Sequence, residues 1–578
     1  MEGFFVDRPF AIILAVDRTG LYTQRKPAIK TRPFIALAVL VTSLIASAEG
    51  VAAEPTLDLL PYPQEVAVGS GSITVPSLDS IQVRLAPKNA LPVSGYTIKV
   101  GPKNVEITAA DKAGAFYAKK TLEQLAQKKG DRYTIPRCTI RDWPAFAWRG
   151  VMLDECRHFF GKEAVKKTLD AMADHKMNVF HWHLTEDQAW RLAVPKFPKL
   201  ITYGAVRSQS QYPDGLGKGR ELDGQKYGPF YYTEADVREI VAYAKARQIR
   251  VIPEIELPGH AYAAIVSYPN LCCSGKVGAR DPWARWGISR EIFCAGNDET
   301  IKFLEQVLEY VVSLFPDEVV HIGGDEAPKS RWAACPKCQA RIKEKGLKDE
   351  NELQAWMTRH FVEFLAKKGR RAVGWDEVMA AEIPASTMIM WWHGKNHDVV
   401  TDAVTKGHDV IACPSGSCYF DFLQCEPEEY EKRGYGYPTR RAKPLTVKAV
   451  WGFNPYGGVS PEQQKKIVGI QCNLWSEHIL TPTEMEWKLW PRAAAIAETG
   501  WRGPNAGTWA DFRRRCLVDI DRMTKAGHEV YHFPGFHELR LMSYNVHTMR
   551  SGKVDEAKEL GRMTGLCATF AEAIPLQE

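Results

Sequence analysis

The sequence predicts an α/β protein in which a (β/α)8 barrel, or TIM barrel, is preceded by a small α/β domain. From about residue 144 onward, strand-like and helix-like periodicity alternate repeatedly, which is typical of a parallel sheet. Eight strand-like runs occur in this part, the number that closes such a barrel. An open, doubly wound sheet is the alternative, but no G-x-G-x-x-G motif follows the first strand.

The predicted barrel strands are short apolar runs, most of them separated by helical segments. In chain order they are RGVMLDE (149–155), NVFHWHL (178–184), IRVIPEIE (249–256), EVVHIGG (318–324), RAVGWDE (371–377), TMIMWWH (387–393), DVIACPS (409–415) and GIQCNLW (469–475). The segment between the third and fourth strands predicts an amphipathic helix, because its apolar residues recur at helical spacing. These residues are Ile301, Leu304, Leu308, Val311 and Phe315. We place the barrel domain at residues 144–535.

Residues 54–143 predict the small α/β domain. Residues 95–100 and 104–110 alternate as strands do, and residues 113–129 read as a helix. The proline-broken sequence DWPAF (142–146) marks the junction with the barrel. At the other end, residues 509–527 predict a helix, and residues 536–578 form a tail to which the sequence gives no role.

Residues 1–53 predict a signal peptide region. A basic stretch (24–33) precedes an apolar stretch (34–46) and small residues (47–53), so cleavage is expected after Ala48 or Ala53. The apolar stretch is short for a transmembrane helix, which needs about 20 residues. We therefore expect an exported protein, periplasmic or secreted, that leaves the membrane once the signal is removed. An uncleaved anchor is the alternative, and the distance of the signal from Met1 suggests an over-extended start.

The composition is that of an ordinary globular protein, with 25% charged and 45% apolar residues. A formal charge of +6 without a long basic block gives no indication of nucleic-acid binding. The 13 cysteines suit disulfides in an oxidising compartment, and a bond of Cys272 or Cys273 with Cys294 is one suggestion. Cys335 and Cys338 form a C-x-x-C motif, which could be a disulfide loop, a redox pair or half of a zinc site. Zinc is the least favoured of these, because no second C-x-x-C follows.

Two adjacent acids, Asp325 and Glu326, follow the fourth strand in the sequence HIGGDEAP (321–328). Neighbouring side chains on a regular strand point to opposite faces. Gly323 and Gly324 allow the backbone to bend, so both acids are predicted to face one cavity at the carboxyl ends of the barrel strands.

The other strand ends also carry polar and aromatic residues, and they leave two kinds of site open. His181, His183, His260 and Asp325 imitate the ligand set of a metal-dependent barrel hydrolase. Trp182 and the acids and aromatic residues that follow the later strands suit a sugar pocket better. We therefore favour a carbohydrate site.

The chain resembles the exported bacterial β-N-acetylhexosaminidases of glycoside hydrolase family 20. The resemblance covers residues 56–535 and rests on motifs that occur in family order. They are RGVMLDECRHFF (149–160), NVFHWHLTEDQAWR (178–191), PEIELPGH (253–260), FCAGNDET (293–300), HIGGDE (321–326), GWDEV (374–378), NLWSEH (473–478) and PRAAAIAETGW (491–501). The resemblance implies hydrolysis of terminal, non-reducing β-linked N-acetylglucosamine or N-acetylgalactosamine, with retention and without a cofactor or metal.

By this resemblance, Glu326 is the general acid and base, and Asp325 stabilises the substrate's acetamido group, whose oxygen serves as nucleophile. Tyr419 aims that oxygen, while His260 and Glu186 form a relay to Glu326. The implied substrate-binding residues are Arg157, Trp375, Trp392, Asp421, Trp475 and Glu477.

Three positions depart from the family pattern, and two other functions stay open. Glu186 stands where the family most often has Asp, Ala189 where Gly is usual, and His393 where Arg is frequent. The longer side chain at position 186 changes the geometry expected of the relay. The alternatives are a catalytically silent glycan-binding barrel and an enzyme that releases a disaccharide such as lacto-N-biose.

Overall fold

The computed structural model describes residues 57–278, 280–380, 382–394, 397–439 and 443–534. The predicted signal peptide region (1–53) and C-terminal tail (536–578) lie outside the described residues.

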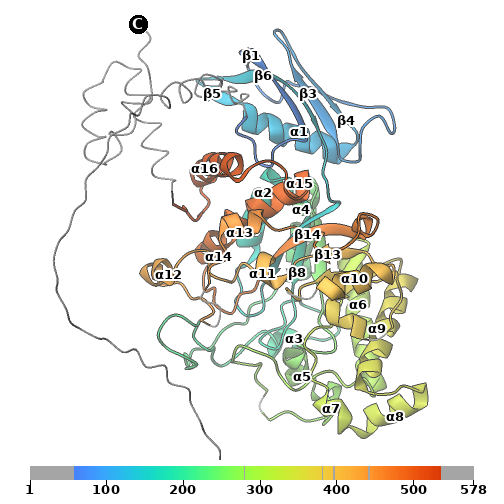
Figure 1. Cartoon of the computed structure of the whole chain (residues 1–578). Coiled ribbons are helices and arrows are strands. Elements are labelled where there is room, and N and C mark those ends of the chain that lie inside the picture. Colours follow the sequence, from blue (N-terminus) through green and yellow to red (C-terminus); the bar gives the residue numbers. More distant parts are fainter. Residues whose placement is uncertain (1–56, 279, 381, 395–396, 440–442, 535–578) are drawn as a thin grey trace, which may run out of the picture. The chain divides into compact units, whose positions relative to one another are not determined.

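The small domain is a six-stranded sheet with one helix packed against it (Figure 1). The strand order is β1-β6-β3-β4-β2, and β5 pairs with β6. The elements are β1 (Glu65–Val75), β2 (Val83–Leu85), β3 (Tyr96–Val100), β4 (Val105–Ala109), α1 (Lys112–Leu125), β5 (Gln127–Lys129) and β6 (Arg132–Asp142). The two strands and the helix expected from the sequence are therefore present. The helix ends four residues earlier than expected, and its predicted end is the short strand β5.

No strand was expected at the position of the long strand β6, which contains Pro136. A proline removes a backbone donor and is tolerated in sheets only where that donor is not needed. Pro136 lies opposite Ser72, where the register with β1 shifts between Val68 and Ser72. Pairing with β3 begins only at Thr139, so the missing N–H breaks no regular ladder.

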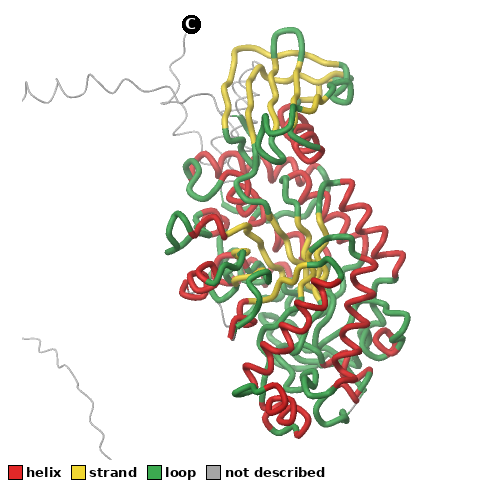
Figure 2. Tube along the Cα trace, turned by 90° about the vertical axis from the view of Figure 1, so that its right-hand side faces the viewer, coloured by secondary structure: helices red, strands yellow, loops and turns green. Residues whose placement is uncertain are grey.

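The second unit is a closed barrel of eight parallel strands, as the sequence predicts. All eight predicted runs are strands, and they pair in the order β10-β11-β12-β13-β14-β7-β8-β9. Their bounds are β7 (Trp148–Asp154), β8 (Val179–His183), β9 (Arg250–Glu254), β10 (Val319–His321), β11 (Arg371–Trp375), β12 (Met388–Trp391), β13 (Val410–Ala412) and β14 (Ile467–Leu474). Figure 2 shows these strands in yellow with the red helices around them.

The larger helices cover the outside of the barrel. They are α2 (Lys162–Asp174), α4 (Glu234–Ala246), α6 (Asp298–Leu314), α9 (Glu350–Lys367), α10 (His397–Thr405), α15 (Arg492–Arg502) and α16 (Trp509–Lys525). In α6 the predicted apolar face is buried as expected, including Ile301, Leu304 and Val311. No helix within the described ranges is both long and apolar enough to span a bilayer.

The remaining helices, most of them short, lie in the loops that follow the strands or in the connections between helices. They are α3 (Lys199–Thr202), α5 (Tyr262–Ser267), η1 (Pro269–Leu271), α7 (Ser330–Ala333), α8 (Pro336–Lys345), η2 (Asp376–Ala380), α11 (Ser415–Cys418), α12 (Pro427–Arg433), α13 (Val447–Trp451), η3 (Gln463–Lys466) and α14 (Pro482–Leu489). Such loops supply the functional side chains of a barrel.

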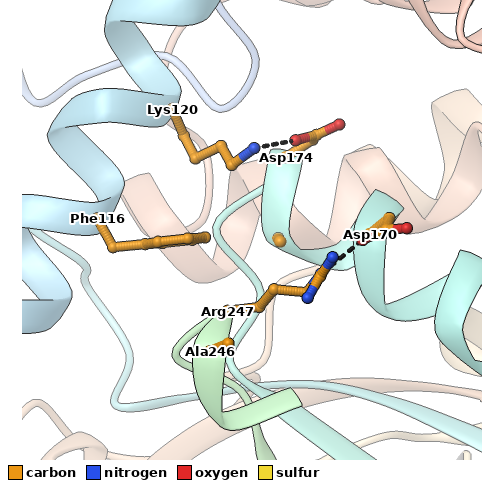
Figure 3. Close-up of a pocket in the computed structure, with 7 residues that line it drawn as sticks. Phe116, Lys120, Asp170, Asp174, Ala246 and Arg247 are labelled. Carbon is orange, nitrogen blue, oxygen red and sulfur yellow. Dashed lines mark hydrogen bonds and ion pairs between the residues drawn. The ribbon is translucent and has the colours of Figure 1, made fainter. Parts of the chain in front are cut away.

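Buried polar contacts join the small sheet to the barrel at the predicted junction. Asp142 is fully buried, lies 3.0 Å from Lys176 Nζ and accepts a hydrogen bond of 2.8 Å from the Trp501 indole. Nearer the surface, Lys120 on α1 forms an ion pair of 2.8 Å with Asp174 at the end of α2 (Figure 3). Because breaking a buried ion pair costs far more than an exposed one is worth, Asp142 is the stronger link between the two units.

Candidate active site

A small cavity of about 190 Å³ lies at the carboxyl ends of the barrel strands. It is lined by Arg157, Glu186, His260, Asp325, Glu326, Trp392, Tyr419, Asp421, Phe422, Trp475 and Glu477. These residues follow β7, β8, β9, β10, β12, β13 and β14, so the loops after nearly all the strands contribute. Every residue of the carbohydrate site named from the sequence except Trp375 lines this one cavity, and Phe422 joins them.

The turn after β10 brings Asp325 and Glu326 to the same cavity. Gly323 and Gly324 have φ angles of 62° and 105°, in the region that favours glycine. A Cβ atom on Gly323 would lie 1.7 Å from a carboxyl oxygen of Glu256, so no larger residue fits there. Glu326 itself has a φ of 44°, a strained conformation for a residue with a side chain. Gly323 therefore does more than bend the chain, since it also allows the chain to pass the buried Glu256.

His260 lies between the acid pair and Glu186. Its Nδ1 atom is 2.7 Å from Glu186 Oε1, and its Nε2 atom is 3.5 Å from Asp325 Oδ2 and 3.7 Å from Glu326 Oε2. Burial would lower the pKa of His260, but the carboxylates of Glu186 and Asp325 outweigh it and raise this pKa well above its ordinary value. The three carboxyl groups around the ring therefore favour its protonated form.

Glu186 reaches its partners despite the longer side chain at this position. Its carboxylate pairs with Arg157 Nη2 as well as with His260. Burial would raise the pKa of Glu186, but Arg157 and His260 together lower it. The extra methylene therefore does not break the contact between position 186 and His260.

Glu326 lies at the mouth of the cavity, and its side chain is 41% exposed. Partial burial and the neighbouring Asp325 carboxylate raise the pKa of Glu326 above its ordinary value. A carboxyl group that keeps its proton toward neutral pH can act as a general acid.

One end of the cavity is lined by charged groups that suit hydroxyl groups of a ligand. Arg157 donates hydrogen bonds to Gln188 (2.9 Å) and Asp154 (3.1 Å), and its Nη2 atom lies 3.9 Å from Glu477. Its guanidinium also lies 5.2 Å from the centroid of the Trp475 ring. These contacts hold Arg157 in one position before a ligand arrives.

The cavity wall is aromatic. Tyr419 lies nearly parallel to Trp392, with ring centroids 6.1 Å apart, and 6.0 Å from Trp475. Flat apolar faces of this kind pack against the faces of sugar rings. Trp392 is held in turn by Glu377, which accepts its indole N–H at 2.8 Å and also accepts the backbone N–H of Glu326 at 3.3 Å.

Glu377 and Phe422 are absent from the site predicted by the sequence. Burial, Asp325 and Asp376 raise the pKa of Glu377 to about 7. Its position directly after Trp375 and Asp376, at the end of a predicted strand, was the signal that could have identified it. Phe422 carried no signal beyond its place next to Asp421.

Trp375 does not line the cavity, contrary to the expectation that it walls the sugar. It is 1% exposed, donates its indole N–H to Glu254 at 2.8 Å and lies 5.9 Å from the ring of Trp475. The polar edge of the indole is therefore occupied by a buried carboxylate, and its ring lies beside that of Trp475.

The histidines of β8 serve that same carboxylate. Glu254 is fully buried and is contacted by His181 (3.0 Å), His321 (2.8 Å) and His183. Neither His181 nor His183 lines the cavity that contains His260 and Asp325. The four ligands of the alternative metal site are therefore divided between two environments, and the structure does not assemble that site.

A (β/α)8 barrel with paired acids and aromatic walls at the carboxyl ends of its strands is typical of glycoside hydrolases. The model of glycosyl hydrolase family 20, catalytic domain, matches residues 146–504, and that of domain 2 of the same family matches residues 72–143. The chain belongs to glycosyl hydrolase family 20.

Several named proteins are similar to this chain. A β-hexosaminidase of Porphyromonas gingivalis is 38% identical over 79% of this chain, which spans 57% of that protein's length. A β-hexosaminidase of Akkermansia muciniphila is 33% identical over 74% of this chain and 83% of its own length. An exo-β-N-acetylglucosaminidase of Vibrio harveyi, solved in complex with N-acetylglucosamine, superposes with a TM-score of 0.72 at 29% identity, covering 82% of this chain and 78% of the other.

Proposed function

We propose that this protein is an exo-β-N-acetylhexosaminidase that releases terminal, non-reducing β-linked N-acetylglucosamine or N-acetylgalactosamine with retention. The observation that carries the proposal is the turn at Gly323 and Gly324, which presents Asp325 and Glu326 to one small cavity beside Tyr419. Membership of glycosyl hydrolase family 20 supports it.

The reaction follows from the positions of these groups. The acetamido oxygen of the substrate attacks the anomeric carbon, the glycosidic bond breaks, and the leaving oxygen takes the proton of Glu326. The product of this step is an oxazolinium ion. A water molecule then gives a proton to the Glu326 carboxylate while the water oxygen attacks the anomeric carbon. This attack opens the oxazolinium ring and restores the acetamido group. Two inversions at one carbon give net retention.

Asp325 and Tyr419 act on the acetamido group. The hydroxyl of Tyr419 donates to the acetamido oxygen and aims it, and the Asp325 carboxylate accepts the amide N–H. Positive charge develops on this group as the bond to carbon forms, so a fixed carboxylate stabilises the transition state more than the ground state. Holding an internal nucleophile in line can contribute roughly 7–11 kcal/mol in favourable cases.

The size of the cavity favours release of a single sugar. Its volume of about 190 Å³ is below the roughly 300–1,000 Å³ of clefts that hold larger ligands. Arg157, Asp421 and Glu477 suit the hydroxyl groups of a terminal residue. A disaccharide would require more space around Asp421 and Glu477.

The acetamido group of the substrate provides the test of the function. We expect the full chain to hydrolyse 4-methylumbelliferyl β-N-acetylglucosaminide, and kcat/KM to fall steeply as the acetyl methyl group is fluorinated. Fluorine withdraws electrons from the oxygen that must attack. Rates that ignore fluorination would reject substrate assistance. Binding without hydrolysis would indicate a silent barrel, and release of intact lacto-N-biose would indicate the disaccharide-releasing alternative.

The pH dependence should follow Glu326. We expect kcat/KM to fall as the pH rises through the raised pKa of this residue, because only the protonated carboxyl can serve the leaving group. Asp325 is one cause of the raised pKa of Glu326. As the pH rises, the remaining activity of Asp325→Asn should therefore fall at a lower pH than the activity of wild type. Profiles of both proteins between about pH 4 and about pH 9 measure the shift. If the activity of both proteins fell at the same pH, the result would contradict this assignment of Glu326.

We propose further that the protein is exported. The basic, apolar and small-residue stretches within residues 24–53 support this. N-terminal sequencing of the mature protein from the periplasm or medium should begin after Ala48 or Ala53. A mature chain that retains residues 34–46 would instead indicate an anchor.

A further inference from the structure

Four cysteine side chains meet outside the active-site cavity. They are Cys273, Cys294, Cys335 and Cys338, and their sulfur atoms all lie within 4.8 Å of one another. The distances between sulfurs are 3.8 Å for Cys273 and Cys338, 3.8 Å for Cys294 and Cys335, and 3.6 Å for Cys294 and Cys338. We call these four residues the cysteine cluster.

These distances match the edges of a metal tetrahedron. A zinc–sulfur bond of about 2.3 Å gives sulfurs about 3.8 Å apart in a tetrahedral site of four thiolates. A disulfide requires a separation of about 2.0 Å, and all described cysteines are free. The suggested bond of Cys272 or Cys273 with Cys294 is therefore not formed. We propose that the cysteine cluster binds one zinc ion.

The chain is shaped to hold these sulfurs together. Cys335 and Cys338 begin α8, where Cys335 precedes Pro336 as the cap residue. The unpaired backbone N–H groups of a helix start favour the negative charge of thiolates. Cys294 comes from the loop before α6, and a Cβ atom at Gly296 would lie only 2.4 Å from the Cys338 nitrogen. That glycine therefore lets the two loops approach closely enough to share a metal.

The cysteine cluster is enclosed, as a structural zinc site requires. Cys294 and Cys338 are fully buried, Cys335 is 4% exposed and Cys273 is half-buried. All four possible ligands are sulfur, which leaves no open position for a substrate and distinguishes the site from a catalytic zinc.

The position of the cysteine cluster gives the zinc a role. Cys273 and Cys294 lie in the loop after β9, which also carries His260, whereas Cys335 and Cys338 lie in the loop after β10, which carries Asp325 and Glu326. A zinc ion would join these two loops through its bonds to sulfur. Hydrogen bonds continue the connection, because the Phe293 N–H donates to the Pro258 carbonyl at 3.0 Å and the Trp332 indole donates to the Phe293 carbonyl at 2.9 Å. His260 has a φ of 47°, a strained conformation like that of Glu326. The metal would help to hold these two residues at a fixed distance from each other.

The metal content of the full chain tests this directly and does not depend on the proposed function. Protein purified without added metals should contain one zinc per chain by inductively coupled plasma mass spectrometry. A mercurial that blocks thiols should release it, as measured with 4-(2-pyridylazo)resorcinol. The double variant Cys335→Ser, Cys338→Ser should lose the zinc. The matched control Cys272→Ser should keep it, because that sulfur contacts Pro269 and Ser274 instead.

Several outcomes would overturn the proposal. One is a wild-type chain without zinc in which mass spectrometry of alkylated peptides shows disulfides among the four cysteines. Others are stoichiometric iron in place of zinc, or zinc that survives in the double variant. If the double variant does not fold, removal of the metal from wild type decides, since a strong chelator should lower Tm only if zinc is bound.

Discussion

Glu326→Gln is expected to lower kcat/KM for 4-methylumbelliferyl β-N-acetylglucosaminide by about 100- to 10,000-fold, the usual contribution of a general acid–base group. The amide keeps the shape of the side chain but can neither donate a proton to the leaving oxygen nor accept one from water. Because Glu326 is 41% exposed and supports no core packing, Tm should change little. Steady-state kinetics and a thermal melt of the same preparation measure both effects.

A substrate and a nucleophile that need no proton transfer should restore part of the loss. The 2,4-dinitrophenolate of a 2,4-dinitrophenyl glycoside leaves without protonation, and azide attacks without a base. With this substrate, azide should therefore raise the turnover of Glu326→Gln and give the β-glycosyl azide. The control Glu163→Gln removes a carboxylate that is 81% exposed on α2 and should behave as wild type. Undiminished turnover of Glu326→Gln, or loss without azide rescue, would show that Glu326 is not the acid and base.

Asp325→Asn is expected to cost about 100- to 1,000-fold in kcat, comparable to the removal of one fixed electrostatic stabiliser of a transition state. The neutral amide can still lie beside the acetamido group but cannot balance the positive charge that develops there. The loss should therefore appear mainly in kcat, while the affinity for N-acetylglucosamine as product changes less. Kinetics combined with a product-inhibition constant separate the two.

Tyr419→Phe is the comparison for that measurement, since it removes one hydrogen bond to the same group but no charge. We expect it to lose less activity than Asp325→Asn. If Asp325→Asn raised KM with kcat unchanged, Asp325 would serve ground-state binding only, and the acetamido displacement would need a different stabiliser.

The barrel and the acid pair could be predicted because their signals are local. Alternation of short apolar strands with helices such as 301–315 gave all eight barrel strands, and the conformational freedom of Gly323 and Gly324 predicted that adjacent acids share a cavity. Strand β6, by contrast, is not indicated by its local sequence. Pro136 argues against a strand locally, and only its place at a shift in register makes it acceptable.

The partners of side chains from distant loops could not be predicted in this way. By itself the sequence determined the order of elements, the positions where the backbone can bend and the residues placed at strand ends. Only the tertiary structure decided that His181 and His183 contact Glu254, that Trp375 lies behind the cavity, and that Cys273 and Cys294 complete the group begun by Cys335 and Cys338. Periodicity and backbone freedom depend on near neighbours in the chain, whereas these contacts depend on how closing a barrel brings loops together.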